Sequence, residues 1–153
     1  MKNDKTPATI WRFVIALTVL LIWGQSLLGQ ELSNMQSGSV QGFLGRLFGE
    51  EIYRTFLYQN IRKFAHFAEY ALLGAEMAEF RLSAQGTARP RGRLLFVLGP
   101  AVAVIDELLQ FISARAPRVT DVLLDCGGYA FGAAALWGIF LLWRRIYPQK
   151  SRE

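Results

Sequence analysis

Three stretches of the sequence carry ionisable and amide side chains at spacings that could do chemistry. The candidate site residues are Arg62, Lys63, His66, Glu69 and Tyr70 in the first stretch, Asp106, Glu107 and Gln110 in the second, and Arg115, Arg118, Asp121 and Asp125 in the third. Arg62 and His66 are four residues apart, and so are Asp106 and Gln110. Residues at this spacing share one face of a helix, so the sequence predicts helix faces on which several polar groups lie together.

The basic residues of this set are suited to binding an anion. The predicted clamp consists of Arg62, Lys63, Arg115 and Arg118. Three of these four are arginines, and a planar guanidinium can donate two parallel hydrogen bonds to one phosphate or carboxylate. The further candidate binding residues are Glu69, Tyr70, Gln110, Asp121 and Asp125.

His66 is the candidate proton shuttle. It is the only histidine in the chain, and histidine is the side chain that most readily changes its charge near neutral pH. Asp106 and Glu107 are the candidate catalytic partners, because a carboxylate could orient the imidazole, act as a base or hold Mg²⁺ or Ca²⁺. The chain offers one histidine and one cysteine, Cys126, which disfavours a zinc site. The sequence therefore assigns no metal site and identifies no cofactor.

The elements that must position these residues are membrane helices. The chain of 153 residues is 52% hydrophobic and 19% charged, and soluble domains usually contain about 25% charged residues. A helix that spans a bilayer needs about 20 mostly apolar residues. Four segments approach this pattern: 10–28, 64–80, 94–112 and 122–143. We therefore predict an all-α, polytopic membrane protein with four transmembrane helices, which form a single domain over residues 1–153.

The same composition excludes several other classes of protein. The apolar content is too high for a disordered chain, and a single cysteine cannot form a disulfide within the chain. The net charge of +5 comes mostly from arginines that flank the apolar segments. Because the basic residues are not interleaved with aromatic residues on a soluble face, we expect no nucleic-acid partner.

The segment 64–80 is the weakest of the four predicted spans, since it contains His66, Glu69, Glu76 and Glu79. Its middle is apolar, and a count of three spans would place one basic cluster on the opposite side from the others. With four spans, the positive-inside rule puts these clusters and both termini in the cytoplasm. The basic clusters comprise Lys2, Lys5, Arg12, Arg81, Arg89, Arg91, Arg93, Arg144, Arg145, Lys150 and Arg152. The candidate site residues then lie together at the outer ends of the helices.

The first outer loop, residues 29–61, also contains a helical pattern. Its apolar residues Phe43, Leu44, Leu47, Phe48, Ile52 and Phe56 recur at helical spacing, with Arg46, Glu50 and Arg54 opposite. This pattern predicts a short amphipathic helix, which lies either in the outer membrane interface or over the bundle. In the last span, Gly128 and Gly132 predict a close helix contact, within the chain or in a homodimer.

Three blocks of residues occur in a set order: Arg62-Lys63-x-x-His66-Phe67-x-Glu69-Tyr70-x-x-Leu73-Gly74, then Asp106-Glu107-x-x-Gln110, then Arg115 followed by Asp121-Val122-Leu123-Leu124-Asp125-x-x-Gly128. In order and membrane context they resemble the signature blocks of VanZ-like membrane proteins, over residues 10–145. The resemblance implies a small protein of the bacterial cell membrane with four or five helices. The founding member of this family is associated with low-level resistance to the glycopeptide teicoplanin, so the resemblance implies a role in the cell envelope and names no reaction.

Two functions remain open at this point. The first is an outward-facing site for an anionic, lipid-linked or envelope molecule, with or without catalysis. The second is a non-catalytic envelope interaction factor whose polar residues form a structural ion-pair network, such as Arg62 with Asp121. A transporter is disfavoured, because the inner half of the predicted bundle offers only Glu76 and Glu79 as polar groups. The expected partners are membrane lipids, including an anionic lipid-linked envelope precursor, and a second copy of the chain.

Overall fold

The computed structural model describes residues 6–28, 30–49, 51, 55–84, 90, 92–113 and 118–147, and these residues contain helices and no strand. The helices in chain order are α1 (Thr6–Ser26), α2 (Gln30–Phe48), α3 (Phe56–Gln59), α4 (Ile61–Ser83), α5 (Gly92–Ile112) and α6 (Val119–Ile146). The predicted all-α fold is therefore confirmed.

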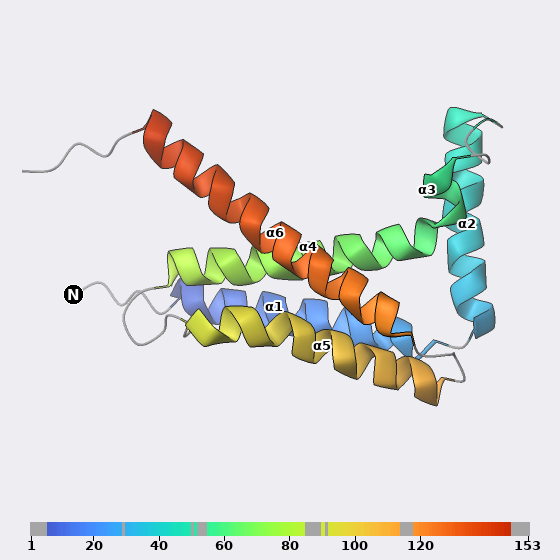
Figure 1. Cartoon of the computed structure of the whole chain (residues 1–153), viewed down its shortest axis with the longest axis horizontal. Coiled ribbons are helices and arrows are strands. Elements are labelled where there is room, and N and C mark those ends of the chain that lie inside the picture. The colour runs from blue at the N-terminus through green and yellow to red at the C-terminus, as the bar shows by residue number, and fades with distance from the viewer. Residues whose placement is uncertain are drawn as a thin grey trace, which may run out of the picture.

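The four long helices α1, α4, α5 and α6 alternate in direction (Figure 1). As a result, one end of the structure contains the first residues of α1 and α5 and the last residues of α4 and α6. We call it the terminal end. Helix α2 runs across the opposite end, together with α3 (Figure 1). We call this opposite end the α2 end. The α2 end is where the candidate site residues lie, because it contains the start of α4, the end of α5 and the start of α6.

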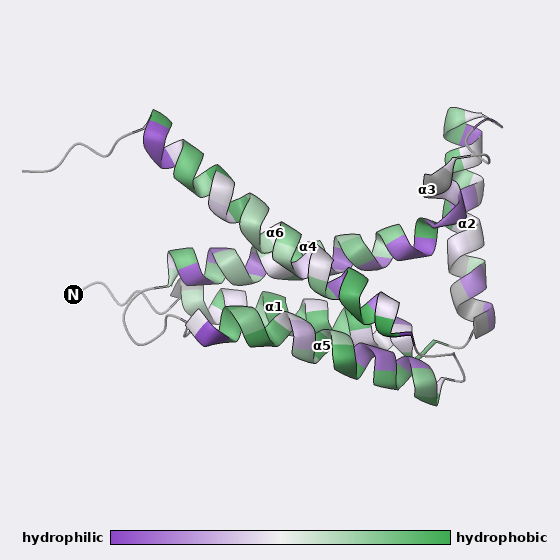
Figure 2. Cartoon of the chain, viewed as in Figure 1, coloured by the Kyte–Doolittle hydropathy of each residue, from purple (hydrophilic) through white to green (hydrophobic). Residues whose placement is uncertain are grey.

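Three of the predicted spans correspond to helices that are long and apolar enough to cross a membrane. These are Ala8–Ser26 in α1, Gly92–Ile112 in α5 and Val119–Ile146 in α6. Helix α4 is of similar length, at 23 residues, and it is more polar than its neighbours (Figure 2). By length and composition the described chain thus has three candidate spans, and the predicted count of four depends on α4.

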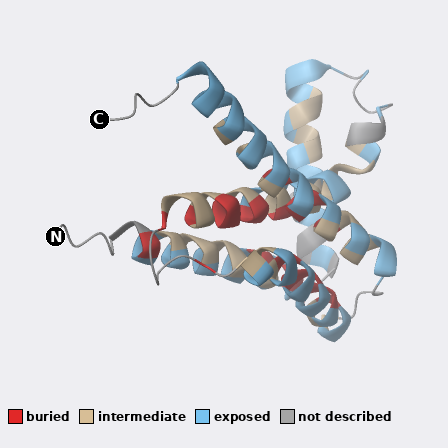
Figure 3. Cartoon of the chain, turned by 60° about the vertical axis from the view of Figure 1, so that its left-hand side comes forward, coloured by how far each residue is buried: buried red, intermediate tan, exposed pale blue. Residues whose placement is uncertain are grey.

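The most polar long helix is also the most central one. Helix α4 packs against α1, α5 and α6, and it buries Tyr70, Leu73 and Met77 on the faces that they cover (Figure 3). The surrounding helices instead expose large apolar side chains, for example Phe96 of α5 at 80%. This arrangement is unfavourable in water and suits a bilayer, in which outward apolar groups contact lipid and polar groups face the bundle interior.

Helices α4 and α6 approach most closely where glycines replace side chains. A Cβ atom on Gly128 or Gly132 would overlap the main chain of α4 at Phe67 or Ala71, and one on Gly74 would overlap the main chain of Tyr129. The close helix contact that the sequence predicts is therefore present within the chain. Small residues permit such contacts between membrane helices because main-chain atoms can then pack directly on one another.

The helix expected in the first outer loop exists, but its predicted position is too late in the sequence. Helix α2 already begins at Gln30 and ends at Phe48, followed by Gly49 with a positive φ of 79°. Glycine tolerates this left-handed conformation, which ends a helix. Of the apolar repeat expected beyond it, Ile52 lies outside the described residues and Phe56 begins α3. Glu50 and Arg54 also lie outside the described residues.

Candidate functional site

Three polar side chains from different helices meet towards the α2 end of the bundle. The Nδ1 atom of His66 on α4 lies 3.9 Å from Oδ2 of Asp106 on α5 and 4.0 Å from Oδ1 of Asp125 on α6. Asp106 is 0% exposed and Asp125 is 1% exposed, whereas the His66 side chain is 20% exposed. We call these three residues the histidine–aspartate cluster. The structure thus brings together one residue from each of the three polar stretches of the sequence.

Asp106 is held in place by hydrogen bonds from two helices. Ser26 Oγ at the end of α1 donates to Asp106 Oδ1 at 2.5 Å, and Gln110 Nε2 donates to Asp106 Oδ2 at 3.1 Å. Ser113 Oγ in turn lies 2.8 Å from the main-chain oxygen of Ser26, to which it donates. These bonds fix the orientation of the carboxylate and join α1 to α5.

Asp125 has a different environment. Its Oδ1 atom is buried and has no hydrogen-bond partner within the described part of the chain. Asp125, Gly128 and Gly132 follow one another at intervals of three and four, so they share the face of α6 that packs on α4. The glycine contact therefore turns Asp125 towards His66, which immediately precedes the contact residue Phe67.

Glu107 is buried as well, but its side chain contacts the main chain at the start of α6. One of its carboxylate oxygens, Oε1, accepts a hydrogen bond from the main-chain N–H of Arg118, the residue directly before α6. Its second oxygen, Oε2, is buried and has no hydrogen-bond partner among the described residues. Main-chain N–H groups near a helix start need such acceptors, because they have no partner inside the helix. The sequence predicts that Glu107 orients the imidazole, acts as a base or holds a divalent ion, and its observed hydrogen bond is with the main chain of Arg118.

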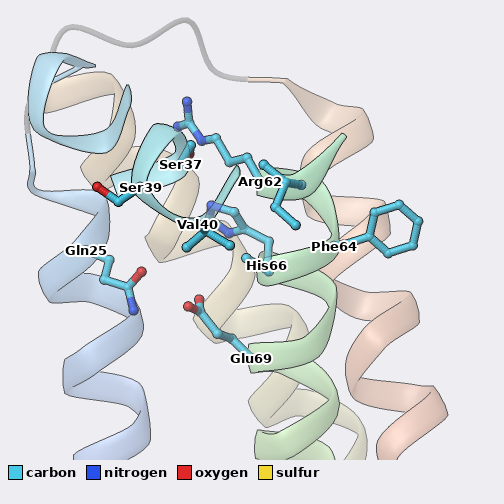
Figure 4. Close-up of a pocket in the computed structure, with 10 residues that line it drawn as sticks. Gln25, Ser37, Ser39, Val40, Arg62, Phe64, His66 and Glu69 are labelled. Carbon is cyan, nitrogen blue, oxygen red and sulfur yellow. The ribbon is translucent and has the colours of Figure 1, made fainter. Parts of the chain in front are cut away.

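A cavity of about 720 Å³ lies beside the cluster, between α4, α2 and the end of α1. Arg62, His66 and Glu69 of α4 line it on one side (Figure 4). Gln25 of α1 and the hydroxyl-bearing Ser37 and Ser39 of α2 line the other sides (Figure 4). His66 thus belongs both to this cavity, which we call the Arg62 pocket, and to the buried cluster.

The other predicted site residues have varied positions. Lys63 and Arg118 are exposed, Asp121 is half-buried, and Arg115 lies outside the described residues. Tyr70 is fully buried, and its hydroxyl has no hydrogen-bond partner within the described chain. Within those same residues the ion pairs join His66 to the two aspartates, and none joins Arg62 to Asp121.

Helices α1 and α2 contribute to the site in a way that the sequence does not predict. Ser26 bonds to Asp106, and Gln25, Ser37 and Ser39 line the Arg62 pocket. A signal for the first two is visible in retrospect, because Gln25 and Ser26 are polar residues at the end of an otherwise apolar span. The two serines of α2 lie in a stretch rich in Ser, Gln and Gly, whose composition is common in loops, so their residue type alone did not indicate a site.

The chain was compared with known protein families, curated proteins and solved structures. A family model described as VanZ/LLP1 matches residues 10–144, which is most of the chain. The comparisons with curated proteins and with solved structures found no match. The match includes every helix that contributes to the histidine–aspartate cluster.

Proposed function

This chain belongs to the VanZ/LLP1 family, and we propose that it is a bacterial membrane protein that binds an anionic, lipid-linked envelope molecule in the Arg62 pocket. The observation that carries this proposal is the composition of that pocket. It combines one guanidinium, from Arg62, with the hydroxyl of Ser37 and the amide of Gln25. Such donors suit the oxygens of a phosphate or carboxylate group.

The orientation in the membrane forms part of the proposal. We assign α4 as a fourth span, because Glu76 in its middle is buried within the bundle and its neighbours expose apolar side chains. Arg12, Arg81, Arg93 and Arg144 belong to the parts of α1, α4, α5 and α6 that lie towards the terminal end. By the positive-inside rule this end is cytoplasmic. The α2 end, with the pocket, then faces outwards at the depth of the lipid headgroups.

Helix α2 supports the placement of the pocket at the membrane surface. It exposes Met35, Phe43, Leu47 and Phe48, and it runs across the bundle end (Figure 1). An amphipathic helix in this orientation can insert its apolar face at the boundary of headgroups and acyl chains. A lipid-linked molecule could then place its anionic group in the pocket and its hydrocarbon chain beside α2.

His66 is the residue that could transfer a proton to or from a bound molecule. It lines the pocket and also faces two buried aspartates. A proton could therefore pass between a bound molecule and these carboxylates by way of the imidazole. Glu107 is a weaker candidate for this role, because it accepts a hydrogen bond from the main chain of Arg118.

The binding proposal is tested by native mass spectrometry of the detergent-purified protein after incubation with envelope lipid extract. We expect the wild type to retain an anionic lipid and Arg62→Gln to lose it. Arg93→Gln is the matched control, because Arg93 is an exposed arginine at the terminal end. If folded Arg62→Gln retains the same lipid as the wild type, or the wild type retains none, the proposal is wrong.

The orientation is tested by labelling with a membrane-impermeant maleimide in intact cells. The background variant is Cys126→Ser, which removes the only cysteine. Ser39→Cys at the α2 end should then react from outside, whereas Ser83→Cys at the terminal end should react only after the cells are broken. The reverse pattern, or equal labelling of both positions in intact cells, would overturn the proposed topology.

A second candidate function is a non-catalytic interaction factor that acts through α2. The exposed apolar residues of α2 favour it, as do the hydrogen bonds that tie Asp106 to Ser26 and Gln110. In this case the double variant Phe43→Ser, Leu47→Ser should lose the cellular function, whereas the Arg62→Gln variant should retain it. The anion-site proposal expects loss of function from Arg62→Gln.

A further inference from the structure

We propose that His66, Asp106 and Asp125 form a binding site for one divalent transition-metal ion, Zn²⁺ or Mn²⁺. The ion would be held by an imidazole nitrogen from α4 and by carboxylate oxygens from α5 and α6. The proposal rests on the geometry of these three side chains and is independent of the proposed anion function.

The positions of the three side chains fit a single ion. One nitrogen or oxygen atom from each residue lies within 4.8 Å of the other two. Three atoms at such spacings have a common point that is at most about 2.8 Å from each, and zinc–nitrogen and zinc–oxygen bonds are about 2.0–2.2 Å long. A movement of less than about 1 Å in each side chain would therefore complete the coordination.

The buried Oδ1 atom of Asp125, which accepts no hydrogen bond within the described residues, is a second and independent reason for the site. Asp125 is 1% exposed, and its Oδ1 atom has no hydrogen-bond partner in the described chain. This same atom lies 4.0 Å from His66 Nδ1, so it points into the cluster. A buried carboxylate oxygen without a partner is costly, and coordination to a cation would satisfy it.

The two buried carboxylates of the cluster also favour a bound cation. Two aspartates are fully buried around one imidazole, and Glu107 lies on α5 next to Asp106. Within the described residues the nearby basic side chains Lys63 and Arg118 are exposed, and Arg62 lines the pocket. A divalent ion would neutralise both aspartates, whereas a protonated imidazole would neutralise one.

Asp106 already has the surroundings of a metal ligand. Ser26 Oγ and Gln110 Nε2 donate hydrogen bonds to it, and these bonds fix its orientation. Carboxylates that bind metals are commonly held by such hydrogen bonds, because a fixed ligand loses less freedom when the ion arrives. The network reaches further, since Ser113 Oγ donates to the main chain of Ser26.

The ligand types select the class of ion. The sequence disfavoured zinc because it offers one histidine and one cysteine, but the fold adds two buried aspartates to that histidine. One imidazole with two carboxylates suits Zn²⁺ or Mn²⁺, whereas Mg²⁺ and Ca²⁺ prefer oxygen ligands alone. Three protein ligands leave a position for water or for a bound molecule. The single cysteine does not belong to this set, because Cys126 lines a separate apolar cavity of about 590 Å³. His66 also lines the Arg62 pocket, so an ion in the cluster would lie at the wall of that pocket.

The test measures metal binding by the full chain, purified in detergent without a polyhistidine tag and treated with a chelator. Isothermal titration with Zn²⁺ and with Mn²⁺, in the absence of lipid, should show one ion per chain. Because changes around metal ligands commonly weaken binding by about 10–100-fold, Asp125→Asn, which removes a ligand, should weaken it by at least about 100-fold. The matched control Glu79→Gln makes the same chemical change near the end of α4 and should bind like the wild type.

A spectroscopic measurement on the wild type covers the case in which Asp125→Asn does not fold. His66 is the only histidine, so pulsed electron paramagnetic resonance of bound Mn²⁺ should show coupling to one imidazole nitrogen. Absence of stoichiometric binding by the folded wild type, a missing nitrogen coupling, or unchanged binding by folded Asp125→Asn would overturn the proposal. Metal binding without retained lipid would contradict the anion function alone, and retained lipid without metal binding would contradict the metal site alone.

Discussion

The two halves of α6 differ in what they contact, although both are rich in apolar residues. Between Val119 and Gly132 the helix buries Asp125, Gly128, Tyr129 and Gly132, whereas no residue from 133 to 146 is buried (Figure 3). In the second half Ile139 is 63% exposed. The half that packs is therefore distinguished by glycines and a carboxylate and not by greater hydrophobicity.

This difference follows from the physics of helices in lipid. An apolar side chain gains little by leaving lipid for another apolar surface, so hydrophobicity does not select which face of a membrane helix packs. Close main-chain contact and polar interactions make that selection. The first half of α6 offers both, through Gly128, Gly132 and Asp125, whereas the second half presents mainly exposed apolar side chains before its last turn.

The largest effect is expected from filling the space at the helix contact. Gly132→Leu should lower the free energy of unfolding by about 3 kcal/mol or more, because its side chain would push α6 away from the main chain of Ala71. Thermal unfolding in detergent measures this change. Gly138→Leu is the control in the second half, where a Cβ meets no atom within 4 Å. Equal losses in both variants would remove the distinction between the two halves.

A smaller loss is expected from the hydrogen bonds that face the first half of α6. Ser26→Ala removes the donor to Asp106 Oδ1 and leaves a buried carboxylate oxygen without that partner. The free energy of unfolding should fall by about 1–3 kcal/mol. Ser83→Ala is the comparison, because Ser83 donates only to the main chain of its own helix at Glu79. A loss no greater than that of Ser83→Ala would show that the bond does not stabilise the fold.

The third substitution should increase the free energy of unfolding, whereas the first two decrease it. In the presence of a chelator, Asp125→Asn should raise the free energy of unfolding by about 1–2 kcal/mol, because it removes a buried charge whose Oδ1 atom lacks a hydrogen bond. Chemical unfolding with and without Zn²⁺ measures the effect, and added Zn²⁺ should favour the wild type. A clear loss of stability under chelation would mean that the charge of Asp125 already has its partner in His66.

The smallest effect is expected in the second half of α6. Ile139→Ala should change the free energy of unfolding by less than about 0.5 kcal/mol, since the side chain is exposed in the folded protein. Val122→Ala provides the comparison in the first half, where Val122 packs against the core, and it should cost about 1 kcal/mol. A larger loss for Ile139→Ala than for Val122→Ala would point to a protein partner on the second half.

Much of the fold could be predicted because apolar segment length and helical spacing are local properties. The sequence predicted an all-α chain, the segments that form α1, α5 and α6, and a close contact at Gly128 and Gly132, which the structure places within the chain. The extent of α2 was missed, because its first residues, from Gln30 to about Gly42, are mostly polar or glycine and contain only Leu32, Met35 and Val40 as apolar residues. The span assigned to α4 stays a prediction, since its polar groups depend on burial by neighbouring helices.

The candidate site was predictable only in part. Convergence of the three polar stretches at one end follows from helix direction, and the structure places His66 with Asp106 and Asp125. The neighbouring carboxylate of Glu107 does not join this cluster, because it accepts a hydrogen bond from the main-chain N–H of Arg118, directly before α6. The participation of Ser26 and of the serines of α2 required a structure, because they lie far from the three polar stretches in the sequence.

The sequence by itself determined the membrane character, the helices and the residue types available at the α2 end, because these depend on composition and on the helical period. Only the tertiary structure decided which carboxylates meet the histidine. Helical spacing fixes which residues share a face, but it does not fix the rotation of one helix against the next. At the contact of α4 and α6 that rotation is set by Gly128 and Gly132, where main chain packs on main chain and Asp125 is turned inwards beside His66.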